Sequence, residues 1–406
     1  MKESIKKRIE AVRRGEVPEG YCRVHPYVIP NDWEVVKLEN ITKRTSRPNK
    51  DRKDRPAYSI NNRKGFVPQN EQFEEGSYED LDKSAYKIVR KGEFAYNPAR
   101  VNVGSIGRLR NAEEVAVSSL YVCVSVDDKV DGEYFDAWTK SLDFYKETVR
   151  NTEGSVREYL FYENFANMRM PIPSRAEQKK IAEILATCDR VIELTQGKID
   201  ELNKLKQTCL RKMFPQKGQA VPEARFPGFS DPWEQRKLGD MCEEFQSGSF
   251  ISASEIYDSG TYPVYGGNGL RGYTESYNHD GVFALIGRQG ARCGNMNISK
   301  GKAYFTEHAV ACKANKSHDT EFLYYLFGTL NLGQYSGQSA QPGLAVGNLV
   351  EVVAKAPTKN EQVAIASYFI KLDNLITLHQ RELEEYEKYK KALMQLLLTG
   401  LVRVNA

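Results

Sequence analysis

The sequence predicts an α+β protein with two mixed α/β globular bodies and two long coiled-coil helices, arranged as an internal repeat. Three observations lead to this prediction. Residues 173–214 align without gaps to residues 357–398, both segments carry a sustained apolar repeat of helical spacing, and short strand-like runs precede each of them. Such a repeat constrains the architecture before any residue chemistry is considered, because both copies are expected to fold alike.

The repeat has a constant offset of 184 positions. The identical pairs are Pro173/Pro357, Glu177/Glu361, Gln178/Gln362, Ile181/Ile365, Asp189/Asp373, Ile192/Ile376 and Gln196/Gln380. A weaker match precedes each copy, where "NDWEVVKLENI" from Asn31 and "DPWEQRKLGDM" from Asp231 share Trp, Glu, Lys and Leu in register. Each half of the chain therefore consists of an entry segment, a variable body and a long helix.

Both long segments have apolar residues in alternating steps of four and three, which is the pattern of a coiled-coil seam. Pro173 and Pro357 mark the helix starts, and Ser174 and Thr358 are followed three residues later by Glu, the spacing of a capping box. A helix of 42 residues spans about 63 Å. The alternative is that the two helices pair inside one ordinary bundle, but about 140 residues of strand-like sequence lie between them.

These features divide the chain into six predicted segments. They are an N-terminal helical extension (1–19), a first body (20–172), a first long helix (173–214), a linker (215–229), a second body (230–356) and a second long helix (357–400). The bodies contain short β-branched and aromatic runs broken by Gly and Asn, which are typical of strands. The linker is rich in Pro, Gly and Phe.

Composition limits the class of protein. The net charge of +4 permits a nucleic-acid partner without requiring one. The seven cysteines are odd in number and never spaced C-x-x-C, so neither a disulfide framework nor a zinc site is expected. The N-terminus lacks an apolar signal core, and no uncharged apolar run of 18 residues occurs. We therefore expect a cytoplasmic protein.

Catalytic motifs are nearly absent. Gly267, Gly269 and Gly272 have the G-x-G-x-x-G spacing of dinucleotide loops, but that motif requires a following helix, and a polar, turn-rich run follows Gly272. "YNPAR" from Tyr96 lacks the second proline and the aromatic of an amino-methyltransferase loop, and it is interpreted as a turn. The five histidines are not at metal-ligand spacing. No catalytic, cofactor or metal residue is predicted.

Both bodies instead contain Arg, Lys, Asn, Gln and Tyr in glycine-containing loops. Arg can read guanine and Asn or Gln can read adenine in the major groove, while Lys contacts phosphate. Taken singly, such a residue is more often an ordinary solvated loop residue, but the recurrence of the same mixture in both bodies favours the set. The candidates for DNA binding in the first body are Lys43, Arg44, Arg47, Asn62, Arg63, Lys64, Asn97, Arg100, Asn102, Arg108, Arg157 and Tyr159. Those in the second body are Tyr265, Asn268, Arg271, Tyr273, Arg288, Gln289, Arg292, Asn295, Gln338 and Gln341.

The entry segments, the Pro-x-x-x-Glu-Gln helix starts and the two-body repeat resemble the DNA specificity subunit of type I restriction-modification systems. The resemblance covers nearly the whole chain. It implies two target recognition domains, and two long helices that pack antiparallel with pseudo-two-fold symmetry. Each domain would then read one half of a bipartite, asymmetric DNA target, with the helix length fixing the gap.

The resemblance also implies partners. The family's subunit has no catalytic activity; it binds double-stranded DNA and recruits two modification subunits, which use S-adenosylmethionine to methylate adenine, and restriction subunits, which use ATP and magnesium. The outer faces of the long helices, including Glu177, Gln178, Glu361 and Gln362, are candidate contacts for the modification subunits. Simple helix capping is the alternative for these four residues.

Two other functions stay open at this point. A freestanding methyltransferase or nuclease would bind S-adenosylmethionine or modify DNA by itself. A scaffold that bridges two proteins without DNA would lack the salt-dependent DNA affinity that phosphate contacts produce.

Overall fold

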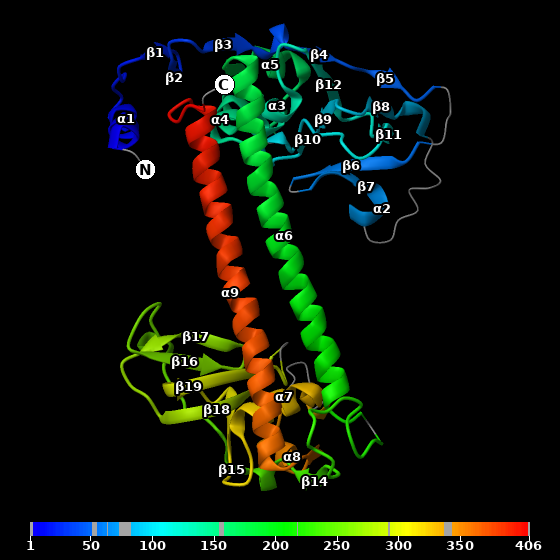
Figure 1. Ribbon diagram of the computed structural model, residues 1–406, viewed down its shortest axis with the longest axis vertical. Helices are drawn as coiled ribbons and strands as arrows, with labels where there is room; N and C mark the ends of the chain where they lie inside the picture. Colours follow the sequence, from blue (N-terminus) through cyan, green and yellow to red (C-terminus); the bar gives the residue numbers. More distant parts are fainter. Residues whose placement is uncertain are drawn as a thin grey trace. The chain divides into compact units, whose positions relative to one another are not determined.

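The computed structural model describes residues 3–50, 55–62, 64–72, 83–153, 158–216, 218–290, 293–336 and 343–404. The chain forms two compact units (Figure 1). The first unit contains Met1–Leu194 and Leu383–Ala406, and the second contains Thr195–Glu382. Each unit thus includes the start of one long helix and the end of the other. Within the described residues, no helix combines the length and apolar character needed to cross a membrane.

The first unit contains two main sheets with the strand orders β10-β9-β12-β4 and β5-β8-β11-β6-β7. Its strands are β1 (Tyr21–Val24), β2 (Tyr27–Pro30), β3 (Glu34–Lys37), β4 (Thr42–Arg44), β5 (Arg47–Pro48), β6 (Ala57–Asn61), β7 (Gly65–Pro68), β8 (Lys87–Arg90), β9 (Phe94–Tyr96), β10 (Ile106–Arg108), β11 (Glu114–Val117), β12 (Val122–Val126) and β13 (Arg169–Ile172). Its helices before the long one are α1 (Glu3–Arg13), α2 (Gln69–Gln72), α3 (Gly132–Thr139), α4 (Leu142–Asn151) and α5 (Tyr162–Asn167), with short 3-10 turns η1 (Leu38–Asn40), η3 (Lys83–Ala85) and η4 (Val101–Val103).

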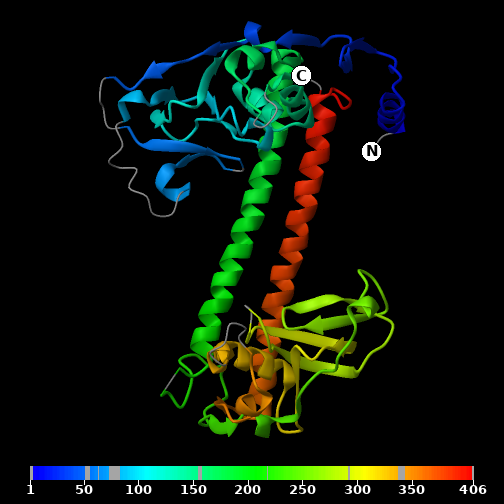
Figure 2. The same cartoon turned by 180° about the vertical axis from the view of Figure 1, so that it is seen from behind.

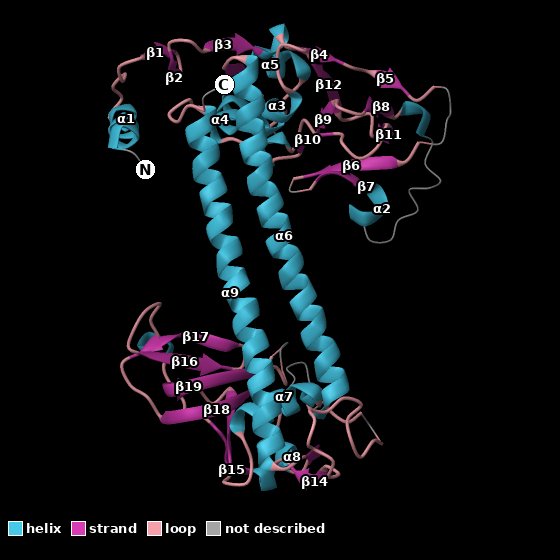
Figure 3. Cartoon of the chain, in the orientation of Figure 1, coloured by secondary structure: helices cyan, strands magenta, loops and turns pink. Residues whose placement is uncertain are grey.

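The second unit is built on one six-stranded sheet with the order β15-β20-β18-β19-β16-β17 (Figure 3). Its strands are β14 (Glu234–Lys237), β15 (Cys242–Ser247), β16 (Tyr262–Gly266), β17 (Gly269–Thr274), β18 (His279–Gly287), β19 (Met296–Phe305), β20 (Ala309–Ala314) and β21 (Val353–Ala356). Its helices are α7 (Thr320–Thr329) and α8 (Val346–Val350), with 3-10 turns η5 (Gly239–Met241), η6 (Ala253–Glu255) and η7 (Leu332–Tyr335).

The two long helices are α6 (Arg175–Met213) and α9 (Lys359–Leu398), drawn in green and orange-red in Figures 1 and 2. Each start is preceded by a short strand that pairs antiparallel with the entry strand of the same unit. In the first unit β13 pairs with β3, and in the second β21 pairs with β14. The entry motif found by sequence comparison therefore has the same structural role twice.

Apolar residues from both long helices contribute to the core of each unit. Ile181 and Leu185 of α6 and Leu397 and Leu398 of α9 belong to the main core of the first unit. Met213 at the end of α6 joins α9 residues in the core of the second unit. Burying each of these side chains contributes about 1.5–3 kcal/mol to folding. Each core is therefore stabilised by residues from both long helices.

Candidate nucleic-acid interface

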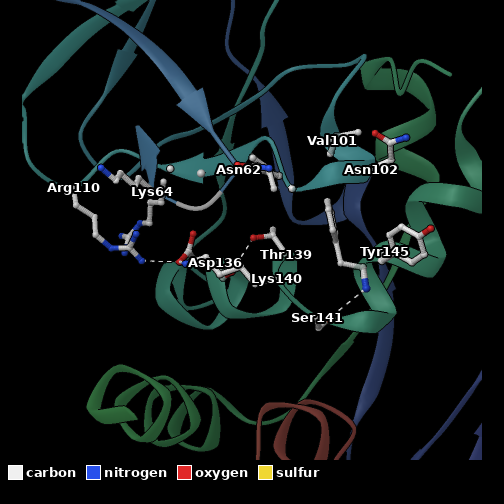
Figure 4. A pocket seen from close by; sticks show the side chains of 16 residues that line it. Asn62, Lys64, Val101, Asn102, Arg110, Asp136, Thr139, Lys140, Ser141 and Tyr145 are labelled. Atoms are coloured by element: carbon white, nitrogen blue, oxygen red, sulfur yellow. Dashed lines mark hydrogen bonds and ion pairs between the residues drawn. The ribbon is translucent and has the colours of Figure 1, made fainter. Parts of the chain in front are cut away.

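The first unit brings four predicted DNA-binding residues together around one pocket. Asn62, Lys64, Asn102 and Arg108 line a cavity of about 310 Å³ (Figure 4). Other polar residues that line the cavity were not among the predicted ones. They include Arg110, Asp136, Thr139, Lys140, Ser141 and Tyr145. Arg110 follows β10, and the others lie on or between α3 and α4, where ordinary helix composition carries no functional signal.

The backbone around this pocket is closely packed. Asn62 and Lys64 lie in the turn between β6 and β7, and Asn102 lies in η4. Gly104, which follows η4, has φ +92°, and a Cβ there would approach the Asn62 carbonyl oxygen to 3.2 Å. A glycine is therefore required for the η4 loop to reach the β6–β7 turn.

An ion-pair network forms one wall of the pocket. Arg108 pairs with Glu133, Arg110 contacts Glu133 and Asp136, and Lys140 donates to Asp136 at 2.7 Å. Burial acts to raise the pKa of Asp136, but Lys140 and Arg110 outweigh it, so this pKa lies below its usual value. Asp136 is thus a buried carboxylate that fixes the positions of two cations.

Two other predicted arginines in this unit have structural partners. Arg47 donates to both carboxylate oxygens of the buried Glu93 at 2.8 Å. Arg44 pairs with Glu163 at 3.3 Å and lies over the ring of Tyr162. Arg47 is therefore committed to an internal ion pair, whereas the Arg44 pair is solvent-exposed and weak.

The remaining candidates in the first unit are spread over loops. Lys43 and Arg100 are exposed. The Asn97 side chain accepts from the Ala99 backbone N–H at 3.0 Å, which makes it a turn residue. Tyr159 stacks on Phe161, with ring centroids 5.7 Å apart and planes 7° apart. Phe161 is 49% exposed, so this pair presents an aromatic surface to solvent.

In the second unit, the glycine motif forms a β-hairpin and has no helix after it. Gly267 and Asn268 form the turn between β16 and β17, and Gly269 begins β17 with φ +99°. Because the segment after Gly272 continues as strand β17, the helix N-terminus that a dinucleotide pyrophosphate needs is missing here. Asn268 and Arg271 are exposed on this hairpin.

Several loops of the six-stranded sheet lie next to one another, at a place that we call the loop junction. A Cβ on Gly267 would lie 3.1 Å from the His308 carbonyl oxygen and 3.2 Å from that of Gln289. The Arg288 N–H donates to the same His308 oxygen at 2.8 Å. The β16–β17 turn, the end of β18 and the β19–β20 turn are therefore adjacent, and they bring Asn268 close to the backbone of Gln289.

Arg288 has a structural role that its sequence context did not reveal. Its guanidinium donates to the backbone oxygens of Leu344 and Glu307 and to Ser247 Oγ. It thus holds three segments together at the loop junction. Tyr265 packs on Phe305, and the Tyr273 backbone bonds to Tyr257. Asn295 is exposed, and its carbonyl accepts from the Gly287 N–H at 2.8 Å.

Two residues at the loop junction carry no signal in the sequence. His308 and Glu307 lie in the β19–β20 turn with their side chains 3.3 Å apart. His308 Nδ1 and Glu307 Oε2 are buried and have no hydrogen-bond partner in the described part of the chain. A lone histidine beside a glutamate carries no motif, so only the structure identifies them.

Five other residues predicted to bind DNA lie outside the described residues. They are Arg63, Arg157, Arg292, Gln338 and Gln341.

The four Glu-Gln residues at the helix starts, which we call the anchor residues, are buried. Glu177, Gln178, Glu361 and Gln362 are 2%, 1%, 2% and 0% exposed. The expectation that they lie on outer faces as partner contacts is therefore wrong, because side chains this buried cannot be reached by another subunit. Their carboxylates and amides are used inside each unit instead.

Each glutamate forms an ion pair with an arginine. The partner of Glu177 lies after α9, and the partner of Glu361 lies in the linker. Glu177 accepts from Arg403 at 2.8 Å and from Trp33 Nε1 at 3.1 Å. Glu361 accepts from Arg225 at 2.8 and 2.6 Å. The expected capping box is only half formed in the first unit: Ser174 Oγ accepts from the Glu177 N–H, but the Glu177 carboxylate points to Arg403.

The glutamines have identical roles in the two units. Gln178 Oε1 accepts from the Asp131 N–H at 2.7 Å, and its Nε2 donates to the Pro173 carbonyl at 3.0 Å. Gln362 Oε1 accepts from the Asp319 N–H at 3.0 Å, and its Nε2 donates to the Pro357 carbonyl at 2.7 Å. Each glutamine therefore fixes the N-cap of a helix, α3 or α7, against the start of a long helix.

The described residues form neither a cluster of metal ligands nor a disulfide. Among the residues that the structure describes, no three His, Cys, Asp or Glu side chains are grouped as a metal site. The described cysteines are all free thiols, and burial raises the pKa of Cys242 to about 12.

Comparisons with a family model and with individual proteins all point to the same family. A model of the type I restriction modification DNA specificity domain matches residues 30–204 and again residues 230–388. The EcoprrI specificity subunit of a type I restriction enzyme from Escherichia coli is 41% identical over 146 residues, which cover 35% of this chain and 36% of that protein. The MjaVIII specificity subunit from Methanocaldococcus jannaschii is 24% identical over 95% of this chain and 97% of its own length.

Solved structures support the same fold. The S subunit of a type I restriction-modification system from M. genitalium superposes with a TM-score of 0.63 at 13% identity, covering 95% of this chain and 99% of that one. A chain from a study of complex assembly and conformational transition in the type I R-M system has a TM-score of 0.56 at 16% identity, over 93% of this chain and all of that one.

Proposed function

The chain belongs to the type I restriction-modification DNA specificity family, and we propose that it recognises a bipartite, asymmetric DNA sequence, one half-site per unit. One observation carries this proposal: the same supporting contacts occur twice beneath two different sets of loops. Each unit repeats the paired entry strand and the glutamine-held N-cap. The polar loops supported in this way differ in sequence, as two readers of different half-sites must.

The reading residues that we favour are those whose side chains have no hydrogen-bond or ion-pair partner in the described chain. In the first unit they surround the cavity of about 310 Å³, where Asn62, Lys64 and Asn102 converge. In the second unit they are Asn268, Arg271 and Gln289, on or next to the loop junction. Arg47 and Arg288 are less favoured because an internal carboxylate or carbonyl oxygens already hold them.

We further propose that α6 and α9 form an antiparallel coiled coil with pseudo-two-fold symmetry. Reciprocal ion pairs support this arrangement. Lys206 of α6 pairs with Asp373 of α9 in the second unit, and Lys390 of α9 pairs with Asp189 of α6 in the first. Lys390 and Asp373 lie 184 positions after Lys206 and Asp189, so the two ion pairs are repeats of each other. A rigid pair of helices of 39 and 40 residues, each about 60 Å long, would fix the unspecified gap between the half-sites.

The catalytic chemistry in this proposal belongs to partner subunits. Modification subunits, two per chain, would bind S-adenosylmethionine and methylate adenine, and restriction subunits would use ATP and magnesium for cleavage. This chain would hold the target and position those subunits. The glycine hairpin gives no support to the alternative of a freestanding methyltransferase, because no helix follows it.

Methylation mapping tests the proposal. Genomic DNA would be sequenced for methyladenine from cells that carry the complete system and from cells that lack this chain. We expect one split motif, with two defined parts and an unspecified gap, that is methylated only when the chain is present. Methylation of a continuous motif, or methylation that persists without the chain, would contradict the proposal.

A binding experiment separates this function from that of a scaffold without DNA. The complex of this chain with its modification subunits would be titrated with a duplex that carries the mapped motif, at increasing salt. Six to ten phosphate contacts lower affinity by roughly 10³- to 10⁵-fold between 50 and 200 mM salt. A scaffold would bind weakly at every salt concentration and would not prefer the mapped motif.

A further inference from the structure

The internal repeat makes it possible to compare corresponding positions of the two units. On the long helices the offset is 184, so Asp189 corresponds to Asp373 and Lys390 to Lys206. On the short helices, Asp131 and Asp319 are corresponding N-caps, because their backbone N–H groups donate to Gln178 and Gln362 respectively. Counting six residues on from each N-cap makes Ala137 of α3 the counterpart of Tyr325 of α7.

Tyr325 occupies a well-defined side-chain site in the second unit, formed by Asp373, Phe369 and Lys206, which we call its seat. It is 5% exposed, and its hydroxyl donates to Asp373 Oδ2 at 2.7 Å. Its ring centroid lies 5.0 Å from that of Phe369 and 5.7 Å from Lys206 Nζ. Burial, and then the hydrogen bond to Asp373, raise the pKa of Tyr325, so the phenol remains a neutral donor. The seat therefore combines an apolar wall, a carboxylate acceptor and a nearby ammonium group.

The first unit keeps the polar half of this seat and lacks the ring. Lys390 donates to Asp189 Oδ1, just as Lys206 donates to Asp373 Oδ1. The described chain provides no donor for Asp189 Oδ2, the oxygen that corresponds to the acceptor for Tyr325. The polar partners of a phenol are thus in place, although α3 presents no phenol.

The space of the missing ring is open. Three corresponding positions are smaller in the first unit: Ala137 for Tyr325, Leu185 for Phe369 and Ala186 for Ile370. These three residues line a pocket of about 600 Å³ together with Asp189, Lys390 and Met394, and we call it the α3–α6–α9 pocket. All of its lining residues belong to the first unit.

We propose that the α3–α6–α9 pocket receives a tyrosine side chain presented by a modification subunit. The ring would lie on Leu185 and Ala186, and the hydroxyl would donate to Asp189 Oδ2 beside Lys390. The proposal rests on the proposed function, which supplies the partner. A protein is favoured over a small molecule because the rim carries charges of both signs, among them Lys140, Arg190 and Glu193. An aromatic anchor in a pocket with a polar rim is the usual organisation of a protein–protein hot spot.

The decisive variant fills the pocket with a tyrosine from this chain. Ala137→Tyr places a phenol where Tyr325 stands in the second unit, so it should compete with the partner's side chain. We expect the dissociation constant for the modification subunit at the first unit to rise by roughly 30-fold, the usual effect of losing a hot-spot anchor. The readouts are isothermal titration of the full chain with the modification subunit, and the number of subunits bound by native mass spectrometry. Glu183→Gln, an exposed residue on the same helix, is the matched control and should bind as the wild type does.

A second measurement guards against misfolding of Ala137→Tyr. The wild-type chain would be titrated with p-cresol, the tyrosine side chain as a free molecule, and with toluene, which lacks the hydroxyl. We expect p-cresol, and not toluene, to weaken binding of the modification subunit, and Asp189→Ala to abolish the p-cresol effect. Unchanged affinity in folded Ala137→Tyr, together with no effect of p-cresol, would overturn the inference.

The outcomes also separate this inference from the proposed function. If the wild-type chain binds no modification subunit, the proposed function itself fails. If the wild type binds, but folded Ala137→Tyr binds equally well and p-cresol has no effect, only the pocket assignment fails. If p-cresol binds but subunit affinity does not change, the occupant is a free phenol or a second copy of this chain, and a tyrosine of the modification subunit is ruled out.

Discussion

The glutamates at the starts of α6 and α9 are buried, and each forms an ion pair inside its own unit. The carboxylate of Glu361 lies in a buried ion pair with Arg225, and Glu177 has the corresponding role with Arg403. Removing one member of a buried pair leaves an uncompensated group, which costs more than the pair itself contributes. These residues are therefore structural determinants of the units even though their sequence pattern suggested contacts with partners.

The Glu361–Arg225 pair gives a stability prediction. Glu361→Gln removes a charge-assisted, bidentate interaction, so the free energy of unfolding should fall by about 2 kcal/mol. Urea denaturation followed by tryptophan fluorescence would measure the fall. Glu201→Gln, on the exposed face of α6, is the control and should change stability by less than about 0.5 kcal/mol. Equal midpoints for the two variants would show that the ion pair is not needed.

His318 gives a pH prediction for the second unit. Burial lowers the pKa of His318, and Arg236 and Lys359 lower it further. A folded-state pKa below the unfolded value of about 6.5 means that the unfolded chain binds the proton more tightly. Stability should therefore fall as the pH drops below about 6.5, and His318→Gln should reduce that fall. Urea midpoints at pH 7.5 and 5.5 provide the comparison, and identical pH dependence of variant and wild type would refute it.

Arg271 is the sharpest test of base reading at the glycine hairpin. It is exposed on β17, the edge strand of the six-stranded sheet, three residues after Asn268 in the hairpin turn. Arg271→Ala should weaken binding to the mapped motif by about 1–3 kcal/mol if the guanidinium reads a base, with relaxed selectivity at one position. If it contacts phosphate, binding should weaken equally for all sequences and the salt slope should decrease by about one. No change in either quantity would remove Arg271 from the interface.

At the scale of elements, the N-terminal extension is attached to the end of the chain. Arg8 of α1 donates to the Leu401 carbonyl at 2.7 Å and lies over the ring of Tyr21. The Tyr21 hydroxyl donates to the Gly400 carbonyl at 2.6 Å. Arg8 and Tyr21 thus contact the segment that leads from α9 to Arg403. Sequence analysis predicted the helix of the extension but gave no indication of this contact.

This contact predicts what removal of the extension does. Deleting residues 1–19 should expose the segment after α9 and make cleavage at Arg403 by trypsin several-fold faster, because the Arg8 hydrogen bond is lost. The cleavage rate, followed by mass spectrometry, is the measurement, and Lys6→Ala, which leaves Arg8 in place, is the control. An unchanged cleavage rate after the deletion would contradict a protective role.

Across elements, the sequence predicted periodic features well and specific contacts poorly. Helix α6 begins two residues after the expected start at 173 and ends one residue before 214, since a long apolar repeat is a strong signal. The outer-face role of Gln178 was wrong, because its partner, the Asp131 N–H, lies 47 residues away in sequence. Single-sequence patterns do not report such distant pairing.

At the scale of the whole molecule, the candidate interface could be only partly predicted. The pocket joins loops from separate strands, and residue type alone selects Asn62, Lys64 and Asn102 among its lining residues but not Arg110 or Asp136. The same reasoning selected Arg47 and Arg288, which have internal partners. An arginine that binds a carbonyl oxygen and one that is free to bind a base look alike in a sequence, so only three-dimensional contacts separate them.

The modular reading of DNA is tested most directly by exchanging one body. Residues 230–356 would be replaced by the corresponding body of another family member, and methylated adenines would be mapped in cells that carry the otherwise complete system. One half of the split motif should change while the other half and the gap remain, because the first unit and both long helices are retained. A change in both halves, or in neither, would contradict recognition of one half-site by each unit.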